Sequence, residues 1–188
     1  MLNKGTVTKK SAMRETVEWI VTLAVAIVLA LAIHRWVGQL VIVEGESMEP
    51  TLHNAERVLL GKLEYRNTPP KRGDIVVLKY PGVKEDIIKR VIAVAGETIT
   101  VHNGSVYIDG IRLDEPYIME PIEDETEPTK VPDGTIFVMG DNRNNSMDSR
   151  SVSVGPIALD QVLGRAYVAV WPVENWEMLT GYTGGLVD

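Results

Sequence analysis

The sequence predicts a mainly β fold, in which an N-terminal transmembrane helix is followed by an antiparallel β-sheet domain with a small inserted subdomain of strands and loops. Short runs of β-branched residues, each bounded by turn-forming residues, recur along most of the chain, as in strands joined by hairpins. No long helical pattern appears beyond the N-terminal region. That region holds a continuous apolar stretch, which is typical of a membrane helix.

The apolar stretch covers residues 19–33, WIVTLAVAIVLALAI, and contains no charged residue. A helix needs about 20 residues to cross a bilayer, so we predict a transmembrane helix over 19–37, in which the polar residues that follow the stretch reach the headgroups. Four cations precede it, at positions 4, 9, 10 and 14. The positive-inside rule therefore places residues 1–18 in the cytoplasm and residues 38–188 outside the cell membrane, as in a single-pass membrane protein.

A cleavable signal peptide is an alternative, because Ala30-Leu31-Ala32 has the small-x-small form of a cleavage site. This triplet lies inside the apolar stretch, and no polar, turn-prone region follows it. We therefore favour an uncleaved anchor over a removed signal peptide, and both over a buried helix of a soluble protein.

The segments after the anchor that we predict to be strands are closely spaced. Two of their connections look like hairpin turns, His102-Asn103-Gly104-Ser105 and Asp109-Gly110. This spacing favours antiparallel sheets over strands that alternate with helices. The predicted strands are residues 40–45, 57–63, 74–80, 86–96, 98–104, 105–110, 135–140 and 162–172.

Residues 111–134 differ in composition from the rest of the chain. They hold seven acidic residues before Lys130, and they have prolines at 116, 121, 128 and 132. Such a segment is a poor core strand, and charge runs of this kind are usually wet surface. We predict a long, solvated excursion from the main sheet, with residues 98–134 as the inserted subdomain.

Composition excludes several classes of protein. The net charge of −7 argues against a nucleic-acid binder, which needs a basic face for the phosphates. The absence of cysteine excludes a disulfide scaffold, cysteine zinc sites and a thiol nucleophile. The chain has only the histidines His34, His53 and His102, so we expect no histidine-rich metal cluster.

Ser47 is the candidate nucleophile. It lies in the stretch VEGESMEPTL, directly after an apolar run, where a serine is either a turn residue or a nucleophile with a base nearby. His53 is close in sequence, but nothing marks the carboxylate that a serine–histidine pair needs. Lys89 is the better candidate base, because in a strand it shares a face with the β-branched residues two positions away on either side.

Desolvation is what a lysine base requires. An apolar pocket disfavours the ammonium and can lower the pKa of lysine from about 10.4 to ~7–8. The neutral amine of Lys89 could then take the proton of Ser47 as the serine attacks a carbonyl carbon. The plainer alternative is a lysine whose stem crosses apolar surface while its ammonium reaches solvent.

Four stretches of the chain, in this order after an anchor, resemble type I signal peptidase, the membrane-bound serine endopeptidase that removes signal peptides. The resemblance covers nearly the whole chain, and the short length with one anchor is similar to the form in Gram-positive bacteria. The stretches are Ser47-Met48-x-Pro50-Thr51-Leu52, Arg57-Val58-Leu59, Lys89-Arg90-Val91-Ile92 and Gly140-Asp141-Asn142-Arg143-x-x-Ser146-x-Asp148-Ser149-Arg150.

The resemblance implies a role for each matching residue. Ser47 is the nucleophile, and its backbone N–H helps to form the oxyanion hole. Lys89 is the general base, and Ser146 hydrogen-bonds the lysine amine. Met48 and Leu52 flank the nucleophile and lie close to bound substrate or lipid, although a core role stays open for each. The residues that support the site are Asp141, Arg90, Asp148 and Arg150.

The resemblance also implies the reaction and the partners. The substrates are secretory preproteins, cut after small residues in Ala-x-Ala sequences, in a groove near the surface of the lipid bilayer. The implied fold is mainly β, and neither a metal nor a cofactor is needed. The chain departs from the family pattern in having Gly45 where many members have an oxyanion-hole serine, and Ala93–Glu97 where Gly-x-Pro-Gly-Asp is common. Glu46 has no explanation in the motif.

Two other functions stay open on the sequence alone. A self-cleaving regulator also uses a serine–lysine dyad, but it acts in the cytoplasm through a DNA-binding domain, for which residues 1–40 leave no room. A non-enzymatic, membrane-tethered β module that binds an exported partner would keep its function when Ser47 and Lys89 are each replaced by alanine.

Overall fold

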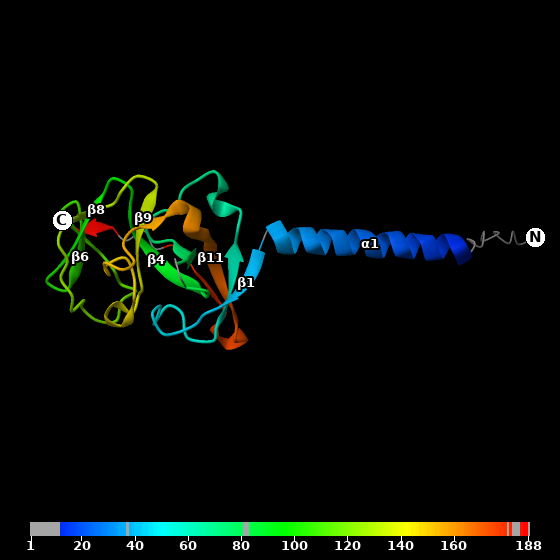
Figure 1. Ribbon diagram of the computed structural model, residues 1–188. Helices are drawn as coiled ribbons and strands as arrows, with labels where there is room; N and C mark the ends of the chain where they lie inside the picture. Colours follow the sequence, from blue (N-terminus) through cyan, green and yellow to red (C-terminus); the bar gives the residue numbers. More distant parts are fainter. Residues whose placement is uncertain (1–11, 37, 81–82, 180, 182–184, 188) are drawn as a thin grey trace, which may run out of the picture. The chain divides into compact units, whose positions relative to one another are not determined.

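The computed structural model describes residues 12–36, 38–80, 83–179, 181 and 185–187 (Figure 1). The chain divides into two compact units, Met1–Val37 and Gly38–Asp188. The first unit contributes one helix, α1, Ala12–Trp36. The second unit holds all the described strands.

Helix α1 consists mostly of alanine, leucine, valine and isoleucine, and it contains no glycine or proline to interrupt it. Glu15 lies in its first turn, where a negative charge is favourable to the helix dipole. The sequence led us to expect a transmembrane span over 19–37, of which Val37 lies outside the described residues. Within the described part of the chain, no helix is both long enough and apolar enough to cross a membrane.

The larger sheet, sheet A, has eight strands, and all of its pairings are antiparallel. The order is β1-β2-β11-β3-β4-β9-β10, with β12 paired to β11 beside this path. The strands are β1 Gly38–Ile42, β2 Arg57–Gly61, β3 Ile75–Lys79, β4 Asp86–Val94, β9 Thr135–Met139, β10 Ile157–Ala158, β11 Val162–Trp171 and β12 Glu177–Met178.

The smaller sheet, sheet B, has five strands in the order β13-β7-β6-β5-β8. Asn103 and Gly104 connect β5 to β6 with φ of 47° and 73°, the left-handed conformation that a two-residue hairpin turn needs. Asp109 and Gly110 do the same between β6 and β7, so both predicted hairpin turns are confirmed. The strands are β5 Thr98–His102, β6 Ser105–Ile108, β7 Ile111–Leu113, β8 Thr129–Lys130 and β13 Leu186–Val187.

Each predicted strand overlaps an observed one, so the prediction of antiparallel β-sheets is confirmed. Only β1 is displaced, because it begins at Gly38 and ends before the turn that carries Ser47. The sequence did not predict the strands of two or three residues, namely β7, β8, β10, β12 and β13. It also did not predict the short 3-10 helices η1 Glu64–Arg66, η2 Arg143–Asn145, η3 Leu159–Gln161 and η4 Val173–Asn175.

The centre of sheet A is buried on both faces. Val76 and Val77 of β3 are fully buried, although successive side chains of a strand point to opposite faces. Val76 packs with Val91 of β4 in one apolar cluster, and Val77 packs with Ile88 of β4 in another. A third cluster contains Ile92 of β4 and the inward side chains of sheet B, so it joins the two sheets. Strand β4 therefore crosses the densest part of the core.

The prediction of a solvated excursion over residues 111–134 is wrong in part. Its first residues form β7, and Leu113, Ile122 and Val131 are buried in the cluster that joins the two sheets. The prolines interrupt regular strands, but the apolar residues between them still pack against sheet B. Acidic residues such as Glu123 and Glu127 are exposed, as expected.

The buried cluster between the sheets can be tested with two valines. Val106 of β6 is fully buried, and Val152 is fully exposed. Val106→Ala should lower the free energy of unfolding by about 2 kcal/mol, because it removes two buried methyl groups and leaves a cavity. Val152→Ala removes the same two methyl groups from an exposed side chain and should change the free energy of unfolding by less than about 0.5 kcal/mol. Urea unfolding measures both, and equal effects would contradict this core.

Candidate active site

Ser47 lies in a turn that begins where the chain leaves β1. Gly45 has φ of +87°, a left-handed conformation that favours glycine, and its N–H donates to Asn54 Oδ1 at 2.9 Å. Met48 and Leu52 are 2% and 0% exposed and pack into the core. These contacts hold the turn on both sides of Ser47. They also give a conformational reason for glycine at a position where the family commonly has serine.

Lys89 lies in the middle of β4, opposite Val76 of β3, and is only 4% exposed. Its Nζ donates a hydrogen bond to Ser47 Oγ at 2.5 Å. Because side chains alternate along a strand, Lys89 and the next residue, Arg90, leave β4 on opposite faces. The structure thus brings the predicted nucleophile and the predicted base into direct contact.

Burial lowers the pKa of Lys89 to about 8. The negative charges of Asp148 and Asp141 act in the opposite direction and raise it, while the guanidinium of Arg150 lowers it further. Desolvation is the largest of these effects, because an ammonium loses its hydration in an apolar surrounding. A substantial fraction of the lysine is therefore a neutral amine just above neutral pH.

The loop of residues 140–150 packs directly against the Ser47 turn. The backbone N–H of Asn142 donates to the carbonyl oxygen of Ser47 at 3.1 Å, and its side-chain amide donates to the carbonyl oxygen of Glu46 at 3.2 Å. A Cβ atom on Gly140 would lie 2.3 Å from the carbonyl oxygen of Ser47 and 2.4 Å from Ser146 Oγ. Only glycine allows the loop to approach this closely.

Two buried ion pairs contain all four residues predicted to support the site. Arg90 donates two hydrogen bonds to the carboxylate of Asp141, at 2.8 and 2.6 Å, and Thr51 Oγ1 donates to the same carboxylate at 2.5 Å. Arg150 donates to both carboxylate oxygens of Asp148 at 2.9 Å. Asp148 also accepts the backbone N–H of Gly140 at 3.0 Å. These pairs join β4, the Ser47 turn and the 140–150 loop.

Ser146 does not make the contact that the resemblance implies. Its Oγ is buried beside Gly140 and has no hydrogen-bond partner among the described residues. Lys89 donates to Ser47 instead, so the hydrogen bond from Ser146 to the lysine amine is absent from this arrangement. The side chain of Ser146 is nevertheless close to the dyad, because Gly140 is packed between Ser146 Oγ and the carbonyl oxygen of Ser47.

Two cavities contain both Ser47 and Lys89 in their lining. The larger, of about 580 Å³, also has Tyr80, Val83 and Met147 in its wall. The smaller, of about 60 Å³, is lined mainly by Val43, Glu44, Met48 and residues 86–89. Met48 therefore faces the smaller cavity, whereas Leu52 lines neither of them and is a core residue.

The alternative base, His53, contacts a carboxylate of its own turn. His53 is about half exposed, and its Nδ1 lies 3.5 Å from a carboxylate oxygen of Glu49 rather than beside Ser47. Among the residues that the structure describes, no group of three or more acidic or histidine side chains is arranged to hold a metal ion.

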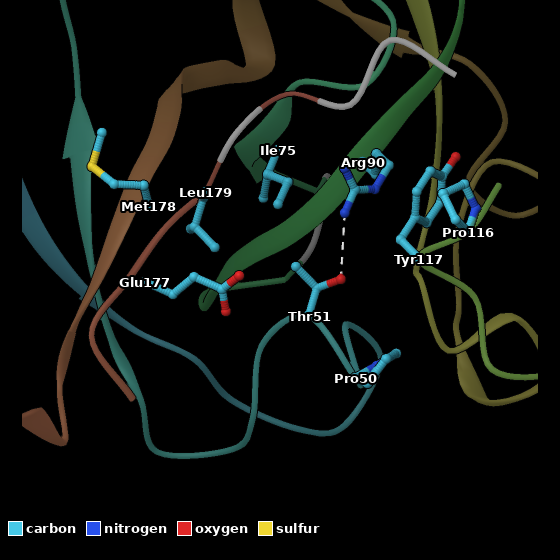
Figure 2. Close-up of a pocket in the computed structure, with 9 residues that line it drawn as sticks. All are labelled: Pro50, Thr51, Ile75, Arg90, Pro116, Tyr117, Glu177, Met178 and Leu179. Atoms are coloured by element: carbon cyan, nitrogen blue, oxygen red, sulfur yellow. Dashed lines mark hydrogen bonds between the residues drawn. The ribbon is translucent and has the colours of Figure 1, made fainter. Parts of the chain in front are cut away.

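A further cavity, of about 300 Å³, lies beside the Arg90 ion pair (Figure 2). Arg90 and Thr51 line it together with Tyr117, whose ring centroid is 4.0 Å from the guanidinium carbon of Arg90. Sequence reasoning missed Tyr117 and its neighbour Glu115, both of which lie in the acidic excursion. An aromatic residue among acidic ones was the available signal that part of this segment is buried.

Comparison with known proteins shows the family to which this chain belongs. The family model "Signal peptidase, peptidase S26" matches residues 16–171. A probable signal peptidase I-2 of Synechocystis sp. is 41% identical over 165 residues, which cover 85% of this chain and 75% of that protein. The signal peptidase I T of Bacillus subtilis is 37% identical over 182 residues, which cover 90% of this chain and 94% of that protein.

A crystal structure of a signal peptidase I from Enterococcus faecalis is 31% identical in sequence, with a TM-score of 0.42, and the match covers 51% of this chain and 95% of that one. The family match and the identities to the curated relatives place this chain in the signal peptidase family, peptidase S26. It is therefore an endopeptidase of the hydrolase class, and the resemblance seen in the sequence is confirmed.

The pKa of Lys89 can be measured directly by NMR titration of its side-chain nitrogen. We expect a midpoint of about 8, because burial disfavours the ammonium, and we expect the signal to be absent in Lys89→Gln. Asp148→Asn should move the midpoint lower still, since the Asp148 carboxylate raises the pKa. A midpoint near the ordinary value of about 10.4 would mean that Lys89 is hydrated.

Proposed function

We propose that this chain removes signal peptides from secretory preproteins with a Ser47–Lys89 dyad. The observation that carries the proposal is the 2.5 Å contact between Lys89 Nζ and Ser47 Oγ, made by a lysine that is almost fully buried. A serine becomes a nucleophile when a base within hydrogen-bond reach can take its proton. A buried lysine with a lowered pKa is such a base.

The reaction follows from these two groups. In the neutral state of Lys89, the hydroxyl of Ser47 donates to the amine, and Ser47 Oγ attacks the carbonyl carbon while its proton passes to Nζ. The backbone N–H of Ser47 stabilises the oxyanion of the tetrahedral intermediate. The ammonium of Lys89 then protonates the leaving amine, which is the new N-terminus of the mature protein. A water deprotonated by the same lysine releases the signal peptide from Ser47.

The smaller cavity supports cleavage after small residues. Its volume of about 60 Å³ suits a methyl side chain, and its walls are the two elements that carry Ser47 and Lys89. An extended peptide that places a small side chain there would bring its carbonyl carbon to Ser47. We therefore assign the residue before the cut to this cavity, in agreement with the Ala-x-Ala preference that the resemblance implies.

An exposed apolar face supports work at a membrane surface. Leu40 and Ile42 of β1 are 54% and 53% exposed, and Leu40 pairs with the exposed Leu59 of β2. Trp171 and Met178, on neighbouring strands, are also exposed. Contiguous apolar side chains on a soluble domain mark contact with a protein or a membrane, and Trp is favoured at the bilayer interface. We propose that this face meets the outer leaflet, with residues 38–188 outside the cell.

The first test is cleavage of a preprotein whose signal ends in Ala-x-Ala, by the full-length protein in lipid. Ser47→Ala and Lys89→Ala should each lower the rate by about 1,000-fold or more, because they remove the nucleophile and its base. Ser153→Ala and Lys84→Ala, at exposed positions, serve as matched controls and should leave it unchanged. Sequencing of the new N-terminus identifies the cut.

Cleavage that survives Lys89→Ala would contradict the dyad and return attention to His53. A wild-type protein that cleaves nothing between pH 7 and 10 would instead favour the binding module. Either result is distinct from the expected one, in which each dyad substitution alone abolishes the product.

The size of the smaller cavity gives a separate prediction. Replacement of the alanine before the cut by leucine should lower kcat/KM by about 100-fold, because the larger side chain does not fit. Ile87→Ala, which enlarges the cavity, should recover about tenfold of this loss. Val83→Ala is the control, since Val83 lines only the larger cavity. An Ile87→Ala variant with the specificity of the wild type would contradict the assignment of this cavity.

A further inference from the structure

The acidic excursion contacts the 140–150 loop along much of its length. Within the excursion, residues 115–124, here called the strap, make the contacts. Asn144 of the loop is held by three residues of the strap, and Arg150 lies 3.5 Å from a fourth, Asp124. The partners of Asn144 are the carboxylate of Glu120 and the carbonyl oxygen of Pro121, each at 3.1 Å, and the backbone N–H of Glu123, at 2.9 Å.

The strongest of these contacts is buried. Glu115 accepts two hydrogen bonds from the guanidinium of Arg143, at 2.6 and 3.0 Å, and the side chains of both residues are at most 3% exposed. The hydroxyl of Tyr117 donates to the same carboxylate at 2.8 Å. Burial opposes the charge of Arg143, but the charge and hydrogen bonds of Glu115, together with Tyr117 and Asp141, outweigh this effect and raise the pKa of the arginine.

Tyr117 lies between the Arg90–Asp141 and Arg143–Glu115 ion pairs. Its ring centroid lies 4.0 Å from the guanidinium carbon of Arg90 and 5.8 Å from that of Arg143. Figure 2 shows the ring beside Arg90, with Thr51 hydrogen-bonded to the arginine from the Ser47 turn. Such cation–π contacts are favourable when water is excluded. Arg90 follows Lys89 directly in β4, so the strap reaches the element that carries the base.

Arg143 links the strap to the part of the loop that contacts Ser47. Its Nε donates to the carbonyl oxygen of Gly140 at 3.0 Å, and its own carbonyl oxygen accepts from Arg150 at 2.5 Å. Arg150 holds Asp148, which in turn accepts the N–H of Gly140. Gly140 is therefore held at both its N–H and its C=O, at the point where the loop touches Ser47.

We infer that Glu115 and Tyr117 are positioning residues of the enzyme, which act through Arg143 and Arg90 to hold the 140–150 loop against the Ser47–Lys89 dyad. A buried ion pair is weak support for stability, because desolvation of both charges costs about as much as their attraction returns. What the Glu115–Arg143 pair provides is a defined geometry. The inference rests on the function proposed above and adds two residues to its site.

A loosened loop should admit water to the dyad. The charged groups that act on the pKa of Lys89 are Asp148, Asp141 and Arg150, all of which belong to this loop. The titratable residues that share a cavity wall with Lys89 are Glu44, Glu46 and Tyr80 in the larger cavity, and Glu44 and Asp86 in the smaller one. Burial is the main cause of the lowered pKa of Lys89. Hydration would therefore raise this pKa, and the acid limb of the pH–rate profile would move upward from about pH 8.

The test compares full-length variants in the preprotein cleavage assay. Glu115→Gln keeps the shape but removes the charge that holds Arg143, and Tyr117→Leu removes the ring. Each should lower kcat about tenfold or more with KM changed by less than about twofold, because misplacement of reacting groups affects the chemical step. In both, the acid limb of the profile should move to higher pH. Glu127→Gln, at an exposed position nearby, is the matched control and should change neither quantity.

Tyr117→Phe keeps the ring over Arg90 and loses only the hydroxyl, so it should recover most of the activity that Tyr117→Leu loses. If Glu115→Gln or Tyr117→Leu does not fold, Tyr117→Phe is compared with the wild type instead, and a kcat lowered tenfold or more in this variant, which keeps the ring, would overturn the role of the ring. The NMR midpoint of Lys89 provides a readout that does not need activity, and in Glu115→Gln it should rise above the wild-type value.

The possible outcomes separate the two proposals. Folded Glu115→Gln and Tyr117→Leu with wild-type kcat, pH profile and Lys89 midpoint would overturn the positioning role, even if their melting temperatures fall. A Tyr117→Phe that is no more active than Tyr117→Leu would overturn the role of the ring. A wild-type protein that does not cleave would overturn the proposed function, and the Lys89 midpoint would still show whether the strap shields the lysine.

Discussion

The contact between Lys89 and Ser47 requires that a lysine be held out of water, and the architecture of the second unit meets this requirement. An ammonium in an apolar surrounding loses hydration that costs several kcal/mol to give up, and the neutral amine is favoured in consequence. Strand β4 supplies that surrounding, because it lies in the centre of sheet A between β3 and β9. A lysine on an edge strand, or near the end of β4, would keep its hydration and its proton.

The acidic residues near Lys89 would defeat this arrangement if they were unpaired. Asp141 and Asp148 both raise the pKa of the lysine, but each also forms an ion pair with an arginine, Arg90 and Arg150. Each carboxylate thus has an arginine partner, and burial remains the largest effect on the pKa of Lys89. The carboxylates of Asp141 and Asp148 can therefore accept hydrogen bonds from Thr51 and from the backbone while Lys89 keeps a lowered pKa.

Sequence reasoning predicted the long strands and the dyad because both leave local signals. Runs of β-branched residues mark β3 and β4, and the alternation within DIIKRVIAV places Lys89 on a face with apolar neighbours. The two-residue strands β8, β10, β12 and β13 leave no such signal, since two residues are too few for a pattern and each strand exists only where another strand offers a partner. The same limit applies to the geometry around Ser146, which depends on the close approach of Gly140.

The acidic excursion illustrates why composition can mislead. Seven acidic residues and four prolines indicate a solvated loop, and most of these side chains do lie at the surface. Glu115 is the exception, because Arg143 from a distant part of the chain makes its burial favourable. The composition of a whole segment does not reveal that one of its carboxylates is buried. The ion pair that this carboxylate forms in the folded protein does.

Strand β4 presents its two cations on opposite faces, Lys89 toward Ser47 and Arg90 toward Asp141. A change of one residue in the length of β4 ahead of them would exchange these positions, because side chains alternate. The guanidinium, which never becomes neutral in proteins, would then lie on the face of the serine, and the lysine would lie on the opposite face, where it could not serve as its base. The order of residues within β4 is therefore tied to activity as well as to folding. A single insertion or deletion in this strand could leave a protein that folds but does not catalyse.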